Sequence, residues 1–265
     1  MKRLRIGVVV LGMVVCVVPS VPAAAAAWEG TATEAAAGVV ATNVPLQPGA
    51  PLVNQGGMWA NTLCTLNFVF QDKSQTYPGT TKLKTYIGTS GHCTLAGVGQ
   101  RAKSPEIGTF GTVVFRVFND PIGTSNDFAL IAVDRDKLKH VSPVMRGYGA
   151  APSGYTTSNQ TNTGDPLVTH GWPSGWPAGV SSGAVTRYGA LALDYPTHFL
   201  SAKPMVLDSG APVVRVLDGK AVGISQEIGI SLSGMTVEHI FVLLRQAGFN
   251  VTLRLSSVAR LASQA

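Results

Sequence analysis

Short apolar runs separated by turn residues dominate the chain beyond residue 57. Many of their members are β-branched or aromatic, and glycine and proline fall between them. This composition favours strands joined by loops over helices. A first series covers residues 63–70, 84–88, 111–118 and 128–133, and a second, after the polar stretch 152–164, covers residues 167–171, 183–188, 198–200, 211–217 and 221–225. The sequence therefore predicts an all-β fold with two successive sets of strands.

The last part of the chain has helical spacing instead. Thr236 can cap the start of a helix and Gly248 can stop it, and a short strand over residues 251–255 is expected to follow. Residues 256–265 form a flexible tail in this interpretation. The apolar positions recur every three or four residues, at Val237, Ile240, Phe241, Leu244 and Ala247.

The N-terminus has the pattern of a secretory signal peptide over residues 1–27. Lys2, Arg3 and Arg5 precede an apolar run at 6–18, and small alanines follow at 23–27. The run is shorter than the roughly 20 residues that a membrane-spanning helix needs. We therefore expect cleavage before Trp28, a secreted product and no stable membrane insertion.

Residues 28–57 are rich in alanine, glycine and proline, with Pro45, Pro48 and Pro51 expected to break regular structure. This segment is predicted to be an N-terminal extension or a short pro-piece. The first set of strands then spans residues 58–150 and the second spans residues 151–255, with the helix in the second.

Charge and cysteine content limit the function further. The chain carries 20 Lys and Arg against 14 Asp and Glu, and the signal peptide holds three of the basic residues, so the mature excess is about three. Without a basic cluster or interleaved aromatics, a nucleic-acid partner is not expected, and we expect a monomer. Cys64 and Cys93 remain after export, and an oxidising compartment lets them form a disulfide. The histidines lack metal-ligand spacing, so no metal or cofactor is expected.

Three short motifs carry the chemistry. Gly91-His92-Cys93 closes one apolar run, Asp127 opens another, and Asp208-Ser209-Gly210 precedes a third. A serine hydroxyl is a poor nucleophile near neutral pH, so it needs a base to take its proton and an anion to orient that base. The order histidine, aspartate, serine differs from that of α/β-hydrolases, in which the serine comes first.

From about residue 56 to about 253, the chain resembles the chymotrypsin-type serine endopeptidases, in particular the small secreted bacterial branch of streptogrisin and alpha-lytic protease. The resemblance rests on the three motifs and on Cys64-Thr65-Leu66-Asn67-Phe68. It implies two antiparallel six-stranded β-barrels with a C-terminal helix, a catalytic triad of His92, Asp127 and Ser209, and a polypeptide substrate. In that family a disulfide ties the segment after the histidine to the strand before it, which here matches Cys64 and Cys93.

The family's Gly-Asp-Ser-Gly-Gly-Pro is here Leu207-Asp208-Ser209-Gly210-Ala211-Pro212. The resemblance assigns the oxyanion hole to the backbone N–H groups of Leu207 and Ser209. Because glycine alone visits positive φ cheaply, Leu207 restricts the peptide that would supply one donor. Two functions therefore stay open: an active endopeptidase, and a catalytically impaired pseudoprotease or binding module of the same fold.

The sequence gives fewer indications of substrate preference. By offset from the family, Lys203 falls at the base of the specificity pocket and Ser225 or Gln226 on the strand that pairs with substrate backbone. A surface position for Lys203 is the competing interpretation. The repeated Gly-Trp-Pro at 171–173 and 175–177 is interpreted as packing in preference to a ligand platform.

Overall fold

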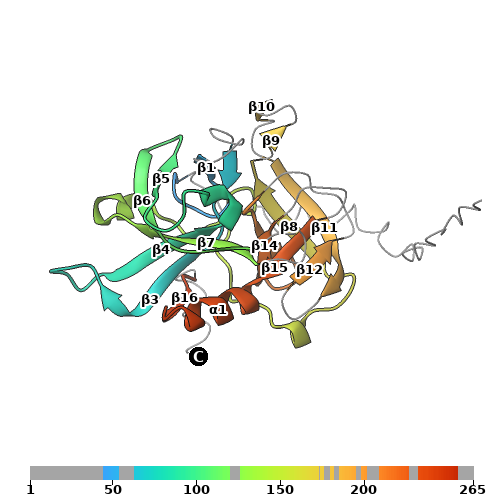
Figure 1. Ribbon diagram of the computed structural model, residues 1–265. Helices are drawn as coiled ribbons and strands as arrows, with labels where there is room; N and C mark the ends of the chain where they lie inside the picture. Colours follow the sequence, from blue (N-terminus) through green and yellow to red (C-terminus); the bar gives the residue numbers. More distant parts are fainter. Residues whose placement is uncertain are drawn as a thin grey trace, which may run out of the picture.

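The computed structural model of the chain describes residues 44–53, 63–119, 126–172, 174–175, 180–181, 185–194, 198–201, 209–226 and 232–255. The predicted signal peptide and tail lie outside these residues. Within them, no helix is both long and apolar enough to cross a membrane. Figure 1 shows two lobes of strands side by side, with helix α1 running along one side of both.

The first lobe is a six-stranded antiparallel sheet in the order β16-β3-β4-β7-β6-β5. Its central strand β7 is buried along nearly its whole length, which explains why its sequence is a continuous apolar run instead of an alternating one. The strands are β3 (Val69–Thr76), β4 (Leu83–Thr89), β5 (Arg101–Ser104), β6 (Gly108–Phe118), β7 (Asp127–Val133) and β16 (Val251–Leu253).

The second lobe is a closed six-stranded antiparallel barrel in the order β11-β12-β15-β14-β13-β8. Its strands are β8 (Pro166–Gly171), β11 (Val185–Asp194), β12 (His198–Ser201), β13 (Pro212–Arg215), β14 (Ala221–Ser225) and β15 (Leu232–Thr236). The expected class is confirmed: an all-β chain with two six-stranded antiparallel sheets and a C-terminal helix. The remaining elements are β1 (Pro51–Val53), β2 (Leu63–Thr65), β9 (Ser174–Gly175), β10 (Val180–Ser181) and the 3₁₀ helices η3 (Gly91–Thr94), η4 (Arg135–His140) and η5 (Ser158–Gln160).

Helix α1 (Val237–Gln246) joins the two lobes. The Thr236 hydroxyl accepts the His239 N–H at 3.2 Å, as expected of an N-cap. The buried face of α1 packs into one apolar cluster that contains Phe70 and Phe128 from the first sheet and Ile224 from the second. One detail of the prediction is wrong: the strand after the helix, placed with the second set, pairs with β3 of the first sheet. The helix carries the chain across, and burial of Val251 and Leu253 holds the strand there.

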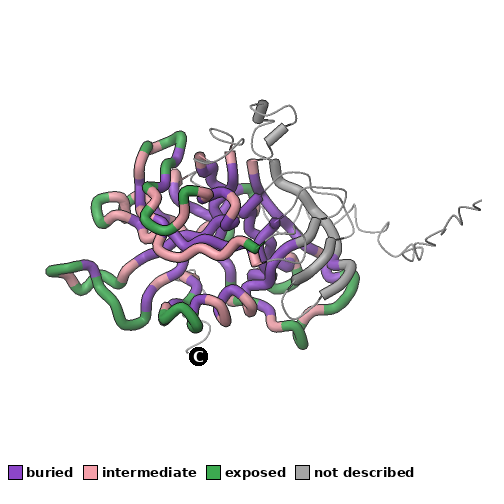
Figure 2. The backbone as a smooth tube through the Cα atoms, viewed as in Figure 1, coloured by how far each residue is buried: buried purple, intermediate pink, exposed green. Residues whose placement is uncertain are grey.

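Residues 44–53 are built into the first lobe, although the sequence places them in a separable extension. β1 pairs with β2, and Leu46, Ala50 and Leu52 are buried in the same cluster as Cys64. Pro51 does not prevent the strand, because a proline at the first strand position gives up no ladder bond. Figure 2 shows that the buried positions of the first lobe extend into this segment. A pro-piece is therefore compatible only with residues that precede Val44, which lie outside the described part.

Candidate active site

A buried carboxylate holds His92 at two points. The Asp127 Oδ2 atom lies 2.6 Å from His92 Nδ1, and Asp127 Oδ1 accepts the His92 backbone N–H at 2.8 Å. The Asp127 side chain is 5% exposed, whereas the His92 side chain is 20% exposed. In a neutral imidazole, a carboxylate at Nδ1 favours the tautomer with the proton on that nitrogen, and the lone pair then lies on Nε2. The predicted histidine and aspartate are thus brought together in the geometry that a general base requires.

The residues around His92 fix the position of its backbone. A Cβ at Gly91 would lie 2.2 Å from Val117 O and 3.1 Å from Asp127 Oδ1, so only glycine lets η3 approach β6 and β7 this closely. The Arg116 Nε atom donates to Gly91 O at 2.9 Å. The Arg116 guanidinium also lies over the Phe118 ring, whose centroid is 6.0 Å from that of the His92 ring.

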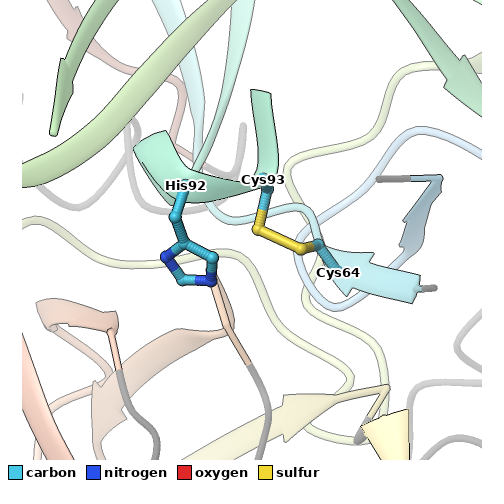
Figure 3. A group of neighbouring side chains, drawn as sticks. All are labelled: Cys64, His92 and Cys93. Atoms are coloured by element: carbon cyan, nitrogen blue, oxygen red, sulfur yellow. A yellow bond between two sulfur atoms is a disulfide. The ribbon is translucent and has the colours of Figure 1, made fainter. Parts of the chain in front are cut away.

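The expected disulfide between Cys64 and Cys93 is present, with a Cα–Cα distance of 6.2 Å. It ties the residue after His92 to β2, as Figure 3 shows. The two sulfurs and the His92 ring lie within 4.8 Å of one another, which resembles a metal-ligand cluster. Both sulfurs are committed to the disulfide and neither can become a thiolate, so the cluster does not fit a metal ion.

Ser209 begins a tight turn beside this disulfide. Its carbonyl oxygen accepts the Thr65 N–H at 2.9 Å and lies 3.9 Å from Cys93 Sγ. The latter is a packing contact, because a disulfide sulfur has no proton to donate. Gly210 follows with a φ of +89°, and a Cβ there would lie 2.3 Å from Thr65 O. The serine predicted as nucleophile therefore lies where the two lobes meet, next to the segment that carries His92.

The other predicted site residues are placed differently. Leu207 and Lys203 lie outside the described residues. Ser225 ends β14, where its N–H donates to Ala211 O at 2.8 Å and its own carbonyl accepts the Gly210 N–H at 2.8 Å. Both backbone groups of Ser225 are thus used within the protein, which does not favour its pairing with substrate backbone.

Trp172 packs between the lobes. Its backbone N–H donates to Thr65 Oγ1 and its indole Nε1–H donates to Gly49 O, each at 3.0 Å. These bonds fit the structural interpretation of the first Gly-Trp-Pro. The second, at 175–177, lies mostly outside the described residues.

His170 is a second histidine at the junction of the lobes, and its environment keeps the ring neutral near neutral pH. Burial, with a smaller effect of the Arg146 charge, lowers the pKa of His170 to about 4. A Cβ at Gly49 would lie 2.8 Å from His170 Cδ2, so the N-terminal segment covers the ring closely. We interpret His170 as a neutral packing residue.

Sequence reasoning missed several residues that hold this site. Arg116 holds the segment around His92 through its guanidinium Nε, and Thr65 holds the Ser209 turn through its backbone N–H. Ser90 and Gly91 directly precede His92, and Ser90 bonds to Ser225 O. Gly91 had a signal, because it directly precedes His92. The contacts of Ser90 and Arg116 depend on which strands become neighbours, and the local sequence carries no sign of that.

Two six-stranded sheets, a C-terminal helix, a His–Asp pair on the first sheet and a serine turn on the second define a chymotrypsin-like fold. No family model matches the chain, and no curated protein matches it. Among solved structures, an alpha-lytic protease homolog N4 matches with 13% identity over 77% of this chain and 97% of its own, at a TM-score of 0.46. The Vibrio cholerae VesB protease matches with 14% identity over 75% of this chain and 63% of its own, at a TM-score of 0.48. A scabies mite inactivated protease paralogue, S-D1, matches with 12% identity over 70% and 87%, also at 0.48. These likenesses are too distant to carry an argument about activity.

Proposed function

We propose that the protein is a secreted serine endopeptidase that hydrolyses polypeptides through His92, Asp127 and Ser209. The observation that carries the proposal is the double contact of the buried Asp127 carboxylate with His92, beside the turn that contains Ser209. We propose that the protein acts as a monomer without a cofactor.

In the proposed reaction, His92 Nε2 takes the proton of Ser209 Oγ as Oγ bonds to the scissile carbonyl carbon. The resulting imidazolium is stabilised by Asp127, and it returns the proton to the departing amine when the C–N bond breaks. Water then attacks the acyl-enzyme by the same route and releases the acid. The oxyanion of each tetrahedral intermediate would be bound by the N–H groups of Ser209 and Leu207.

The alternative is a pseudoprotease or binding module, and it rests on Leu207 and Ala211. The methyl group of Ala211 is accommodated, because the residue is fully buried and its carbonyl still accepts the Ser225 N–H at 2.8 Å. Leu207 is the residue on which the choice between an active endopeptidase and a pseudoprotease depends.

The test is covalent labelling with a fluorophosphonate probe, in which Ser209 Oγ bonds to phosphorus and fluoride leaves. Intact mass counts the adduct and peptide mapping locates it. We expect one adduct on Ser209, none on Ser209→Ala, and a large loss of labelling rate in His92→Ala. A folded protein that takes no label would support the pseudoprotease, and Leu207→Gly would then show whether the oxyanion hole is the missing part.

A further inference from the structure

Ser90 connects the two catalytic segments across the junction of the lobes. It follows β4 and precedes His92 by two residues, and it is fully buried. Instead of capping η3, its hydroxyl donates to Ser225 O in the second barrel at 3.1 Å. The bond joins residues 135 positions apart in the sequence.

The acceptor of this bond, Ser225 O, also accepts a bond from the turn that contains Ser209. Ser225 O also accepts the Gly210 N–H at 2.8 Å, and Gly210 directly follows Ser209. One carbonyl oxygen is therefore bonded to a hydroxyl two residues before His92 and to an N–H one residue after Ser209. Ser225 is itself held in the barrel by its N–H bond to Ala211 O.

The residues around the Ser90–Ser225 hydrogen bond are closely packed and exclude water. A Cβ at Gly210 would lie 3.0 Å from the Ser90 nitrogen and 2.7 Å from Thr89 Oγ1, so the Ser209 turn lies directly on the end of β4. Ser90 and Ser225 are both 0% exposed. Water cannot readily replace a hydroxyl in such a place, so losing the bond changes the relative position of the two segments instead of being compensated locally.

We propose that Ser90 is a positioning residue that sets the distance and orientation between His92 and Ser209. Proton transfer from serine to histidine needs a heavy-atom separation of about 2.6–3.2 Å, and misplacement by about 1 Å can lower a rate about 100-fold. Ser90 acts on that separation through the Ser225 carbonyl and touches no reacting atom. The inference rests on the proposed function, since it concerns the activation of Ser209.

The first test is Ser90→Ala, measured by fluorophosphonate labelling at increasing probe concentration. This yields the maximal labelling rate, kinact, and the probe affinity, KI. We expect kinact to fall at least about tenfold while KI stays within twofold, because positioning affects the chemical step and leaves binding of the probe unchanged. Ser104→Ala is the matched control. Ser104 lies in β5, away from the candidate site, and it is also buried. Its hydroxyl accepts a single bond, from the Glu106 N–H at 3.1 Å.

A second pair of variants separates the hydroxyl from the packing. Ser90→Thr keeps the hydroxyl and Ser90→Val has the same shape without it, and the extended backbone of Ser90 (φ −70°, ψ 146°) accepts both. We expect Ser90→Thr to label at least about five times faster than Ser90→Val.

Equal kinact for wild type and Ser90→Ala, or for the Thr and Val variants, would overturn the positioning role and leave the proposed function intact. A wild-type protein that takes no label would overturn both.

Discussion

The two segments that we propose to be catalytic are held by different kinds of contact. The histidine segment (Ser90 to Thr94) is fixed by side chains: the Asp127 carboxylate, the Arg116 guanidinium and a disulfide. The serine turn (Ser209 and Gly210) is fixed by backbone bonds to Thr65 and Ser225. Side-chain contacts can be removed one at a time, whereas backbone bonds persist in most variants. The histidine segment should therefore respond to substitutions in graded steps, and the serine turn should tolerate most changes but fail sharply where the backbone itself cannot fit.

The largest effect is expected from Gly210→Ala, which breaks the serine turn. The added Cβ would lie 2.3 Å from Thr65 O, a backbone atom, at a φ of +89°. Steric conflict with backbone and strain at positive φ should together cost more than about 3 kcal/mol and abolish labelling of Ser209. Urea denaturation and the probe assay would measure the two effects.

Gly108→Ala is the control for that variant, because Gly108 also has positive φ, at +70°, but no atom lies within 4 Å of its hypothetical Cβ. It should cost only about 1 kcal/mol, from strain alone. Similar losses of unfolding free energy in Gly210→Ala and Gly108→Ala would mean that the serine turn can move away from Thr65. The serine turn would then not be more sensitive to a backbone misfit than the histidine segment is to loss of a side chain.

The next effect is expected from removing the disulfide with Cys64→Ala and Cys93→Ala together. The bridge closes a loop with a sequence separation of 29, for which the chain-entropy model gives about 3–4 kcal/mol. Asp127 and Arg116 still hold His92, so labelling should slow without being lost in protein that stays folded. Thermal unfolding of the double variant against wild type gives the stability change. Complete loss of labelling in folded protein would show that the disulfide alone holds the histidine segment.

Acid should weaken the junction of the lobes through His170. Its pKa is lowered to about 4 in the folded protein, against about 6.5 in an unfolded chain. The unfolded state therefore binds the proton first, so this stability is present above pH 6.5 and is lost as the pH falls toward 4, by up to about 3 kcal/mol. Urea midpoints between pH 7 and pH 4 should fall less steeply for His170→Gln than for wild type. Equal slopes would show that His170 does not contribute.

The fold was largely predictable because its signals are local. Alternating turns and β-rich runs located most strands, and Thr236 and Gly248 marked the ends of the helix to within a residue or two. The errors came from pairing over long distances. The sequence places residues 44–53 in an extension because prolines are expected to break regular structure, yet Leu46, Ala50 and Leu52 are buried in the first core. β16 was assigned to the wrong lobe because only the direction of α1 decides which sheet it joins.

The candidate site divides in the same way. His92, Asp127 and Cys93 sit in motifs that can be recognised from a few residues, and the structure brings them together with the Ser209 turn. The role of Ser90 could not be read from Thr-Ser-Gly-His, because its partner is a backbone carbonyl 135 residues away. A carbonyl has no sequence signature. Ser225 was assigned to substrate by offset, and that assignment stays a prediction; the structure shows its backbone bonded to Ala211 and Gly210.

The smallest effect is expected from Arg116, and it sharpens the contrast because it removes one side-chain contact of the histidine segment. Arg116→Met keeps an apolar stem over Phe118 but loses the bond from Nε to Gly91 O, which measures 2.9 Å. Since Asp127 and the disulfide remain, we expect a cost of about 1 kcal/mol or less and a two- to fivefold slower labelling of Ser209, in line with a single hydrogen bond. The labelling rate of Arg116→Lys should lie between those of wild type and Arg116→Met, because lysine keeps the charge but not the planar donor. If Arg116→Met slowed labelling as much as Gly210→Ala, the histidine segment would not be graded in its response. The histidine segment and the serine turn would then share one cooperative support.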